Sequence, residues 1–148
     1  MSPTTPLNWI EPGFAALPQI SPADLPALAA QGVRLVINNR PDGESPGQPA
    51  TADIAAAAQA AGLAHAAIPI TAPTLEAAEA TRAALAGAPG PVVAFCRSGT
   101  RSATLWACAR ALDGADPARL IEAARRAGFD LSGLAPVLRS LAARAGRA

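Results

Sequence analysis

The sequence of 148 residues predicts an α/β fold in which a small parallel-type sheet is flanked by helices. Short apolar segments alternate along the chain with longer, alanine-rich segments that have helical character. This alternation is typical of parallel strands joined by helical crossovers. No repeat or linker divides the chain, and its length suits one hydrophobic core. We therefore expect a single domain over residues 1–148.

Each expected element has a recognisable start or stop signal. The proline-rich residues 1–20 contain short edge strands near residues 7–10 and 14–16. A helix begins after Ser21, which Pro22 and Asp24 follow in the pattern of a capping box, and glycine at position 32 ends it. Apolar runs predict strands at residues 33–38, 64–70 and 91–95. Further helices are expected over residues 51–61, 74–86, 100–112, 117–127 and 132–145, with Thr51 or a neighbour and Asp116 as N-caps.

A cysteine stands where the third of these strands ends. Cys96 follows the apolar run of residues 92–95 and is joined to the next helix by Arg97, Ser98, Gly99, Thr100 and Arg101. Free loop N–H groups, a helix N-terminus and two arginines all favour a negatively charged sulfur. We expect Cys96 to be an accessible thiolate nucleophile. The alternative, an inert buried residue, fits poorly with the glycine, arginines and hydroxyls that follow it.

Three loops are expected to meet at one edge of the sheet, because the carboxyl ends of parallel strands share an edge. They are residues 38–49, 71–74 and 96–101. In the first loop Arg40 is a candidate for substrate binding, and the alternative is a structural arginine paired with Asp42 or Glu44. Asn38 and Asn39 are expected to hold the backbone of this loop through side-chain hydrogen bonds.

Composition excludes several function classes. The formal net charge is +1, from 12 basic and 11 acidic side chains, which argues against nucleic acid and against an anionic membrane surface.

The one histidine, His65, lies inside an expected strand and cannot form a metal site alone, so we expect no metal and no cofactor. Two cysteines are too few for a disulfide scaffold, and Cys108 is expected to be a core residue, with a resolving cysteine as the alternative. Without a leader or an apolar stretch of about 20 residues, a cytoplasmic protein is expected.

Three longer motifs carry a resemblance. They are N-N-R-P-D-G-E-S-P-G-Q-P at residues 38–49, I-P-I at residues 68–70 and F-C-R-S-G-T-R-S at residues 95–102. Together with residues 19–25 and 127–131, they make the chain resemble the bacterial beta-lactamase-hydrolase-like, phosphatase-like domain family. The resemblance implies a cysteine-phosphatase architecture of the dual-specificity phosphatase type, in an enzyme described either as a sulfurtransferase or as a hydrolase. In several relatives the domain is fused to a metallo-β-lactamase-fold persulfide dioxygenase, so such an enzyme acting in trans is an expected partner.

Two details of the sequence favour sulfur transfer over phosphate hydrolysis. Phosphatases of this type carry H-C-x5-R, whereas only four residues separate Cys96 from Arg101, and Phe95 replaces the histidine. This shorter C-x4-R loop suits a single sulfur atom better than a phosphoryl group. Residues 71–74 also lack the acid that such phosphatases use to protonate the leaving group, although Asp42 or Glu44 could supply that proton.

The predicted activity is transfer of sulfane sulfur from thiosulfate or a glutathione persulfide-type donor to an acceptor, through a persulfide on Cys96. Arg101 is expected to bind the anion of this small sulfur-containing substrate, and Ser102 to contact the sulfur or cap the helix. Four residues are expected to surround the substrate, with the Arg97 side chain facing its remote part: Arg97, Ser98, Gly99 and Thr100. The alternatives are a phosphatase acting through a Cys96 phosphocysteine, and a persulfide-binding partner module of a dioxygenase.

Overall fold

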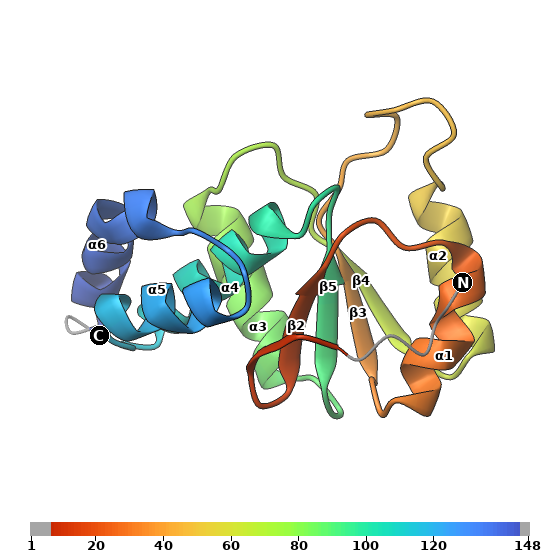
Figure 1. Ribbon diagram of the computed structural model, residues 1–148, viewed down its shortest axis with the longest axis horizontal. Coiled ribbons are helices and arrows are strands. Elements are labelled where there is room, and N and C mark those ends of the chain that lie inside the picture. The colour runs from red at the N-terminus through yellow and green to blue at the C-terminus, as the bar shows by residue number, and fades with distance from the viewer. Residues whose placement is uncertain (1–6, 146–148) are drawn as a thin grey trace.

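The computed structural model describes residues 7–145 and contains one five-stranded mixed sheet with helices on both faces (Figure 1). The strand order is β1-β2-β5-β3-β4, and only the β1–β2 pair is antiparallel. The strands are β1 (Trp9–Glu11), β2 (Phe14–Leu17), β3 (Leu35–Asn38), β4 (Ala64–Ala67) and β5 (Val92–Phe95). The predicted α/β fold is confirmed, and the two short strands expected near the N-terminus form the antiparallel edge. The expectations for residues 1–6 lie outside the described residues.

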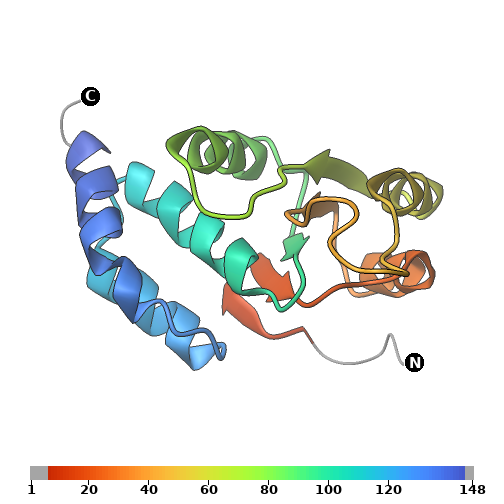
Figure 2. The same ribbon diagram turned by 90° about the horizontal axis from the view of Figure 1, so that it is seen from above.

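The helices form two unequal groups (Figure 2). One face of the sheet is covered by α1 (Leu25–Ala30) and α2 (Thr51–Ala60). On the other side are α3 (Leu75–Ala86), α4 (Thr100–Leu112), α5 (Pro117–Arg126) and α6 (Ala135–Ala145). Of these, α4 packs against the sheet and α3, while α5 and α6 cover its outer side. Short 3₁₀ turns precede α1 and α6, at Pro22–Asp24 and Ser132–Leu134.

The start of α2 and the end of β4 show how local hydrogen bonding sets element boundaries. Of the N-cap candidates for α2, Thr51 or a neighbour, the structure selects the neighbour Ala50, and Thr51 is the first helical residue. The hydroxyl and N–H of Thr51 instead donate to Asp42 Oδ1, at 2.7 and 2.8 Å. Strand β4 ends at Ala67 rather than at residue 70, and Pro69, which has no N–H to donate, follows. The capping box at Ser21 and Asp24 is present as predicted.

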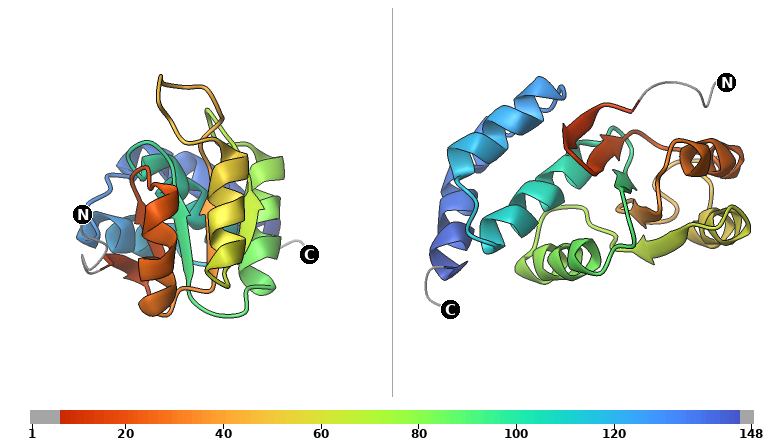
Figure 3. Two further views of the ribbon diagram at one scale, coloured as in Figure 1. Left: turned by 90° about the vertical axis from the view of Figure 1, so that its right-hand side faces the viewer. Right: turned by 90° about the horizontal axis from the view of Figure 1, so that it is seen from below.

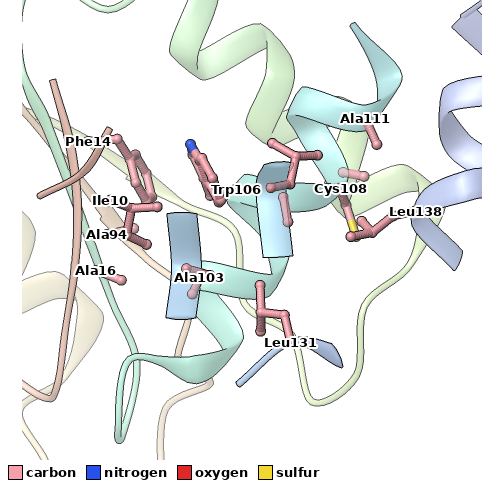
Figure 4. Packing of buried hydrophobic residues seen from close by; sticks show 14 of the residues in the cluster. Ile10, Phe14, Ala16, Ala94, Ala103, Trp106, Cys108, Ala111, Leu131 and Leu138 are labelled. Atoms are coloured by element: carbon pink, nitrogen blue, oxygen red, sulfur yellow. The ribbon is translucent and has the colours of Figure 1, made fainter. Parts of the chain in front are cut away.

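Helix α4 is the centre of the larger core (Figure 4). Ten of its 13 residues are buried, between the sheet on one side and α3, α5 and α6 on the others. Trp106 of α4 stacks on Phe14 of β2, with 6.1 Å between ring centroids. A helix packed on so many sides has a fixed position, and this position determines where its N-terminus points. That N-terminus begins at Thr100, only a short turn after Cys96.

His65 lies half-buried in β4, where its Nε2 atom has no hydrogen-bond partner. Burial lowers the pKa of this imidazole, so the neutral form is favoured. Among residues 7–145 no three metal-binding side chains lie close enough to hold an ion. None of the helices in that range is long and apolar enough to cross a membrane.

Candidate functional site

Cys96 lies at the carboxyl end of β5, directly below the N-terminus of α4. The Gly99 N–H donates to Cys96 Sγ at 3.0 Å, and the Cys96 N–H donates to the carbonyl of Leu17 at 3.3 Å. The expectation of an accessible thiol is wrong in one respect, since Cys96 is only 1% exposed. A substrate therefore has to present a narrow reacting atom to the sulfur. The three loops predicted to meet do surround this edge of the sheet, with residues 39–50 rising above it (Figure 3).

Gly99 provides the turn that brings a backbone N–H onto the sulfur. Its φ of +95° is in the left-handed region, and it is the N-cap of α4. A Cβ at this position would lie 3.0 Å from two ring carbons of Phe129 and 3.4 Å from the carbonyl carbon of Leu17. Glycine is therefore required both by backbone conformation and by space. Sequence analysis did not assign Phe129 to the site, although its ring covers this turn.

Arg101 lies in the first turn of α4 and is held from two other loops. Its Nη1 and Nη2 donate to the two carboxylate oxygens of Glu44 at 2.8 and 2.9 Å, and Nη1 also donates to the carbonyl of Ile70 at 2.9 Å. Of the five N–H donors of a guanidinium, these bonds leave the Nε donor and one Nη2 donor. The pKa of Arg101 is raised, first by Glu44 and further by Cys96, so the guanidinium also acts on the sulfur.

Arg40 holds Glu44 from the opposite side. Its guanidinium is 5% exposed and donates to Glu44 Oε1 at 2.9 Å, to Gln19 Oε1 at 3.0 Å and to Ser45 Oγ at 2.8 Å. These three hydrogen bonds engage the Arg40 guanidinium with other residues of the protein. The structure thus shows the pairing of Arg40 with Glu44 that the alternative at the sequence level expected, and substrate binding by Arg40 stays a prediction.

Three acids near the site are stabilised as carboxylates. Arg101 and then Arg40 lower the pKa of Glu44 to about 2. Hydrogen bonds from Thr51 lower the pKa of Asp42, whose carboxylate faces the start of α2. Asp130, next to Phe129, has its pKa lowered by the hydrogen bond from Ser132. A general acid has to be protonated near neutral pH, and none of these three carboxyls meets that condition.

Ser102 and two asparagines connect the loops below the surface. Ser102 is 1% exposed, and its hydroxyl donates to Asn39 Oδ1 at 2.7 Å. Asn39 Nδ2 in turn donates to the carbonyl of Ile68 at 2.9 Å, and Asn38 Oδ1 accepts the Arg40 N–H at 2.9 Å. The role expected for Asn38 is confirmed, whereas Asn39 connects its loop to the segment after β4 and to α4 rather than holding its own backbone. Ser102, expected to touch the sulfur or cap the helix, bonds Asn39 instead because it points back toward β3.

The rest of the Cys96 loop faces solvent. Arg97, Ser98 and Thr100 are exposed, as expected for residues that surround a substrate. The Arg97 carbonyl accepts the Gln19 N–H at 3.3 Å, and Ser98 Oγ donates to Thr100 Oγ1 at 3.3 Å.

Cys108 belongs to the core and not to this site. It lies in the middle of α4, with its sulfur beside Leu138 (Figure 4). Burial raises the pKa of the Cys108 thiol to about 11, so it stays protonated at neutral pH. The expectation of a core residue is confirmed.

Comparison with known proteins identifies the domain. The phosphatase-like domain of beta-lactamase hydrolase-like proteins matches residues 6–113. The chain belongs to this family. A beta-lactamase hydrolase-like protein of Agrobacterium fabrum is 46% identical over 112 residues, which are 74% of this chain and 26% of that protein. One of Xylella fastidiosa is 40% identical over 107 residues, or 70% and 25%. This phosphatase-like domain thus spans about a quarter of these curated relatives.

Solved structures agree with this assignment. A candidate phosphatase of Neisseria meningitidis superposes with a TM-score of 0.79 at 32% identity, covering 89% of this chain and 95% of that one. Kinase-associated phosphatase superposes with a TM-score of 0.71 at 15% identity, covering 91% and 87%, which shows the fold alone. The beta-lactamase hydrolase-like, phosphatase-like domain therefore has the cysteine-phosphatase fold. Phe129, which covers Gly99, lies beyond the residues that the family pattern matches.

Proposed function

We propose that this phosphatase-like domain is a sulfurtransferase that carries sulfane sulfur on Cys96. The observation that carries the proposal is that the carboxyl groups near Cys96 are ionised. Glu44 and Asp42, the residues considered as acids from the sequence, are both held as carboxylates by Arg101, Arg40 and Thr51. Phosphate ester hydrolysis needs a proton for its leaving group, whereas sulfur transfer releases a stable anion.

The proposed reaction has two displacements. The Cys96 thiolate attacks the sulfane sulfur of the donor, a new S–S bond forms, and the old S–S bond breaks. Its electron pair leaves with sulfite when the donor is thiosulfate, or with a thiolate when the donor is an organic persulfide. An acceptor nucleophile then attacks the outer sulfur of the Cys96 persulfide and returns Cys96 to the thiolate. No proton is required by either displacement.

Two groups around Cys96 suit this chemistry. The Gly99 N–H, 3.0 Å from Sγ, stabilises negative charge on the sulfur at the N-terminus of α4. Arg101 has two N–H donors that bond neither Glu44 nor Ile70, and we assign these to the Cys96 sulfur and to the anionic end of the donor. Burial of Cys96 favours a donor whose reacting sulfur is terminal and narrow, because a wider group meets the loop first.

Intact mass tests the proposal directly. The protein is incubated with thiosulfate or glutathione persulfide, beside Cys96→Ser and Cys108→Ser. We expect the wild type and Cys108→Ser to gain one sulfur atom that cyanide or dithiothreitol removes, and Cys96→Ser to gain none. Absence of an adduct with both donors, together with Cys96-dependent hydrolysis of an aryl phosphate, would refute sulfur transfer.

A cysteine-dependent phosphatase is the second candidate, and a specific observation favours it. The fold is that of cysteine phosphatases, and Arg101 holds a guanidinium near Cys96, as binding of phosphoryl oxygens requires. In this case the intermediate is a Cys96 phosphocysteine. The proton for the leaving group then has to come from water, so activity should be limited to esters with acidic leaving groups such as aryl phosphates.

Exchange of sulfur between Cys96 and a partner enzyme is a further part of the proposal. The curated relatives are about four times as long as the region they share with this chain. We propose that the sulfur on Cys96 can be delivered to, or received from, a persulfide dioxygenase acting in trans. Sulfur transfer that is measurable only when such an enzyme is added would support the reading as a persulfide-binding module.

A further inference from the structure

We infer that Glu44 is a specificity-determining residue, a fixed negative charge that makes the site select sulfur donors with a singly charged reacting end over dianionic ones. This inference deepens the proposed sulfur transfer and rests on it for its main assay. It also makes a prediction about anion binding that does not depend on any reaction.

The contacts of Glu44 place its charge next to the anion-binding donors. Both carboxylate oxygens accept hydrogen bonds from Arg101, at 2.8 and 2.9 Å, and Oε1 also accepts from Arg40 at 2.9 Å. Arg101 acts at the same time on Cys96. The Arg101 guanidinium therefore interacts with both the Glu44 carboxylate and the Cys96 sulfur, and a donor bound by this guanidinium lies close to Glu44.

The charges in this group nearly cancel. Arg40 and Arg101 are positive and Glu44 is negative, since the two arginines stabilise its ionised form. A Cys96 thiolate then brings the total charge of these four side chains to zero. The exposed Arg97 adds one positive charge at the edge of the loop, but the fixed negative charge of Glu44 beside Arg101 still weakens the attraction for a donor that carries two negative charges.

Burial of the partners makes this charge part of a fixed arrangement. Arg40 is almost fully buried and is held by Gln19 and Ser45, so it cannot turn away from Glu44 without losing these bonds. Gln48 anchors the loop further, because its amide donates to the carbonyl of Pro41 at 2.9 Å and its oxygen accepts the Glu44 N–H at 3.1 Å. The carboxylate of Glu44 therefore stays beside Arg101 when a substrate arrives.

Two donors that differ by one charge test the inference. Thiosulfate is a dianion, and methanethiosulfonate is a monoanion of nearly the same shape in which a methyl group replaces one oxygen. Attack by the Cys96 thiolate forms the same persulfide from both, and the electron pair of the broken S–S bond leaves with sulfite or with methanesulfinate. The ratio of the two rates of sulfur gain, measured by intact mass, reports charge selection. General loosening of Arg101 weakens the attraction for the dianion more than for the monoanion, so it shifts this ratio away from thiosulfate, opposite to the direction expected for loss of the Glu44 charge.

The matched control is Glu122→Gln. Glu122 also forms a two-oxygen ion pair with an arginine, Arg125, at 2.9 and 2.6 Å, and its pKa is likewise lowered to about 2. It lies on α5 and outside the Cys96 site. Glu44→Gln keeps the size of the side chain, and Glu44→Ala serves as a second variant if the glutamine variant does not fold.

We expect wild type to react faster with methanethiosulfonate, and Glu44→Gln to shift the ratio about tenfold toward thiosulfate. Coulomb's law for unit charges about 6 Å apart gives an effect of about threefold in water and about 100-fold at the effective dielectric constant near a protein surface. A shift of less than about threefold, or an equal shift in Glu122→Gln, overturns the inference.

A binding measurement separates failure of this inference from failure of the proposed function. Sulfate and perchlorate are tetrahedral anions of charge two and one, and each should protect Cys96 from alkylation by iodoacetamide when it occupies the site. We expect Glu44→Gln to improve protection by sulfate relative to perchlorate. If neither donor yields a persulfide, the proposed sulfur transfer fails, and this protection ratio alone decides the role of Glu44. If the ratio of protection by sulfate to protection by perchlorate is the same in Glu44→Gln and wild type, the inference about Glu44 is overturned.

Discussion

Replacement of Gly99 by alanine is expected to be among the most damaging small changes to the Cys96 loop. Two separate effects add. The φ of +95° disfavours any residue with a Cβ, and the new Cβ would lie 3.0 Å from two carbons of the Phe129 ring. The left-handed conformation costs about 1–2 kcal/mol and overpacking about 1–3 kcal/mol. The expected loss of stability is therefore about 2–5 kcal/mol, or roughly 5–20 °C in Tm for a chain of this size.

Urea unfolding of three glycine variants measures the two effects separately. Gly128 has a φ of +98° but no atom within 4 Å of a Cβ, so Gly128→Ala should cost only the conformational part, about 1–2 kcal/mol. Gly133 has neither a positive φ nor a close neighbour, and Gly133→Ala should be close to neutral. The difference between the Gly99 and Gly128 variants is the steric cost at the Cys96 loop.

A double-mutant cycle with Phe129→Ala then tests the origin of the steric part. Removal of the ring should recover about 1–3 kcal/mol of the loss in Gly99→Ala, while the conformational part remains. Persulfide formation or alkylation of Cys96 should also slow in Gly99→Ala, because the N–H that bonds Sγ at 3.0 Å is displaced. Equal stability of the Gly99 and Gly128 variants, or no coupling with Phe129→Ala, would refute this reasoning.

Three further predictions concern the surrounding network. Ser102→Ala should lower the free energy of unfolding by about 1–3 kcal/mol in urea titrations, because the buried Asn39 oxygen loses its donor, and an unchanged midpoint would contradict this. The pKa of Glu44 is lowered from 4.5 to about 2, so its ion pairs stabilise the fold above pH 4.5 and lose this effect as the pH falls toward 2; Tm measured against pH should fall less steeply there in Glu44→Gln than in wild type. Cys108→Ser should destabilise the protein by about 1–3 kcal/mol, since a hydroxyl replaces a thiol in an apolar site, while mass spectrometry still detects sulfur on Cys96; loss of the adduct would instead place Cys108 in the reaction.

The position of the site was predictable because it depends on local signals. An apolar strand, a cysteine, a glycine and a helix start within residues 92–102 fix the orientation of Cys96 relative to α4. The rule that parallel strands end at a common edge then places residues 38–49 beside it. The hydrogen bond from the Arg40 N–H to Asn38 follows from the same kind of short-range reasoning.

The contacts that define the site in detail depend on residues far apart in the chain. Glu44 meets Arg101 across 57 positions, and Ser102 meets Asn39 across 63. No periodicity or spacing specifies which of several loop carboxylates an arginine will bind. The sequence did not indicate that Phe129 belongs to the site, because an aromatic residue after a helix is typical of core packing. The packing of α5 against α4 brings its ring to Gly99.

The burial of α4 has a consequence for how this domain can change over evolution. The helix that carries Arg101 is also the middle of the core, so substitutions in it alter folding and the orientation of the guanidinium together. Arg97, Ser98 and Thr100, by contrast, border the same sulfur and face solvent. New substrate preferences can therefore arise at these three positions at little cost in stability, whereas substitutions in the buried part of α4 change the core as well.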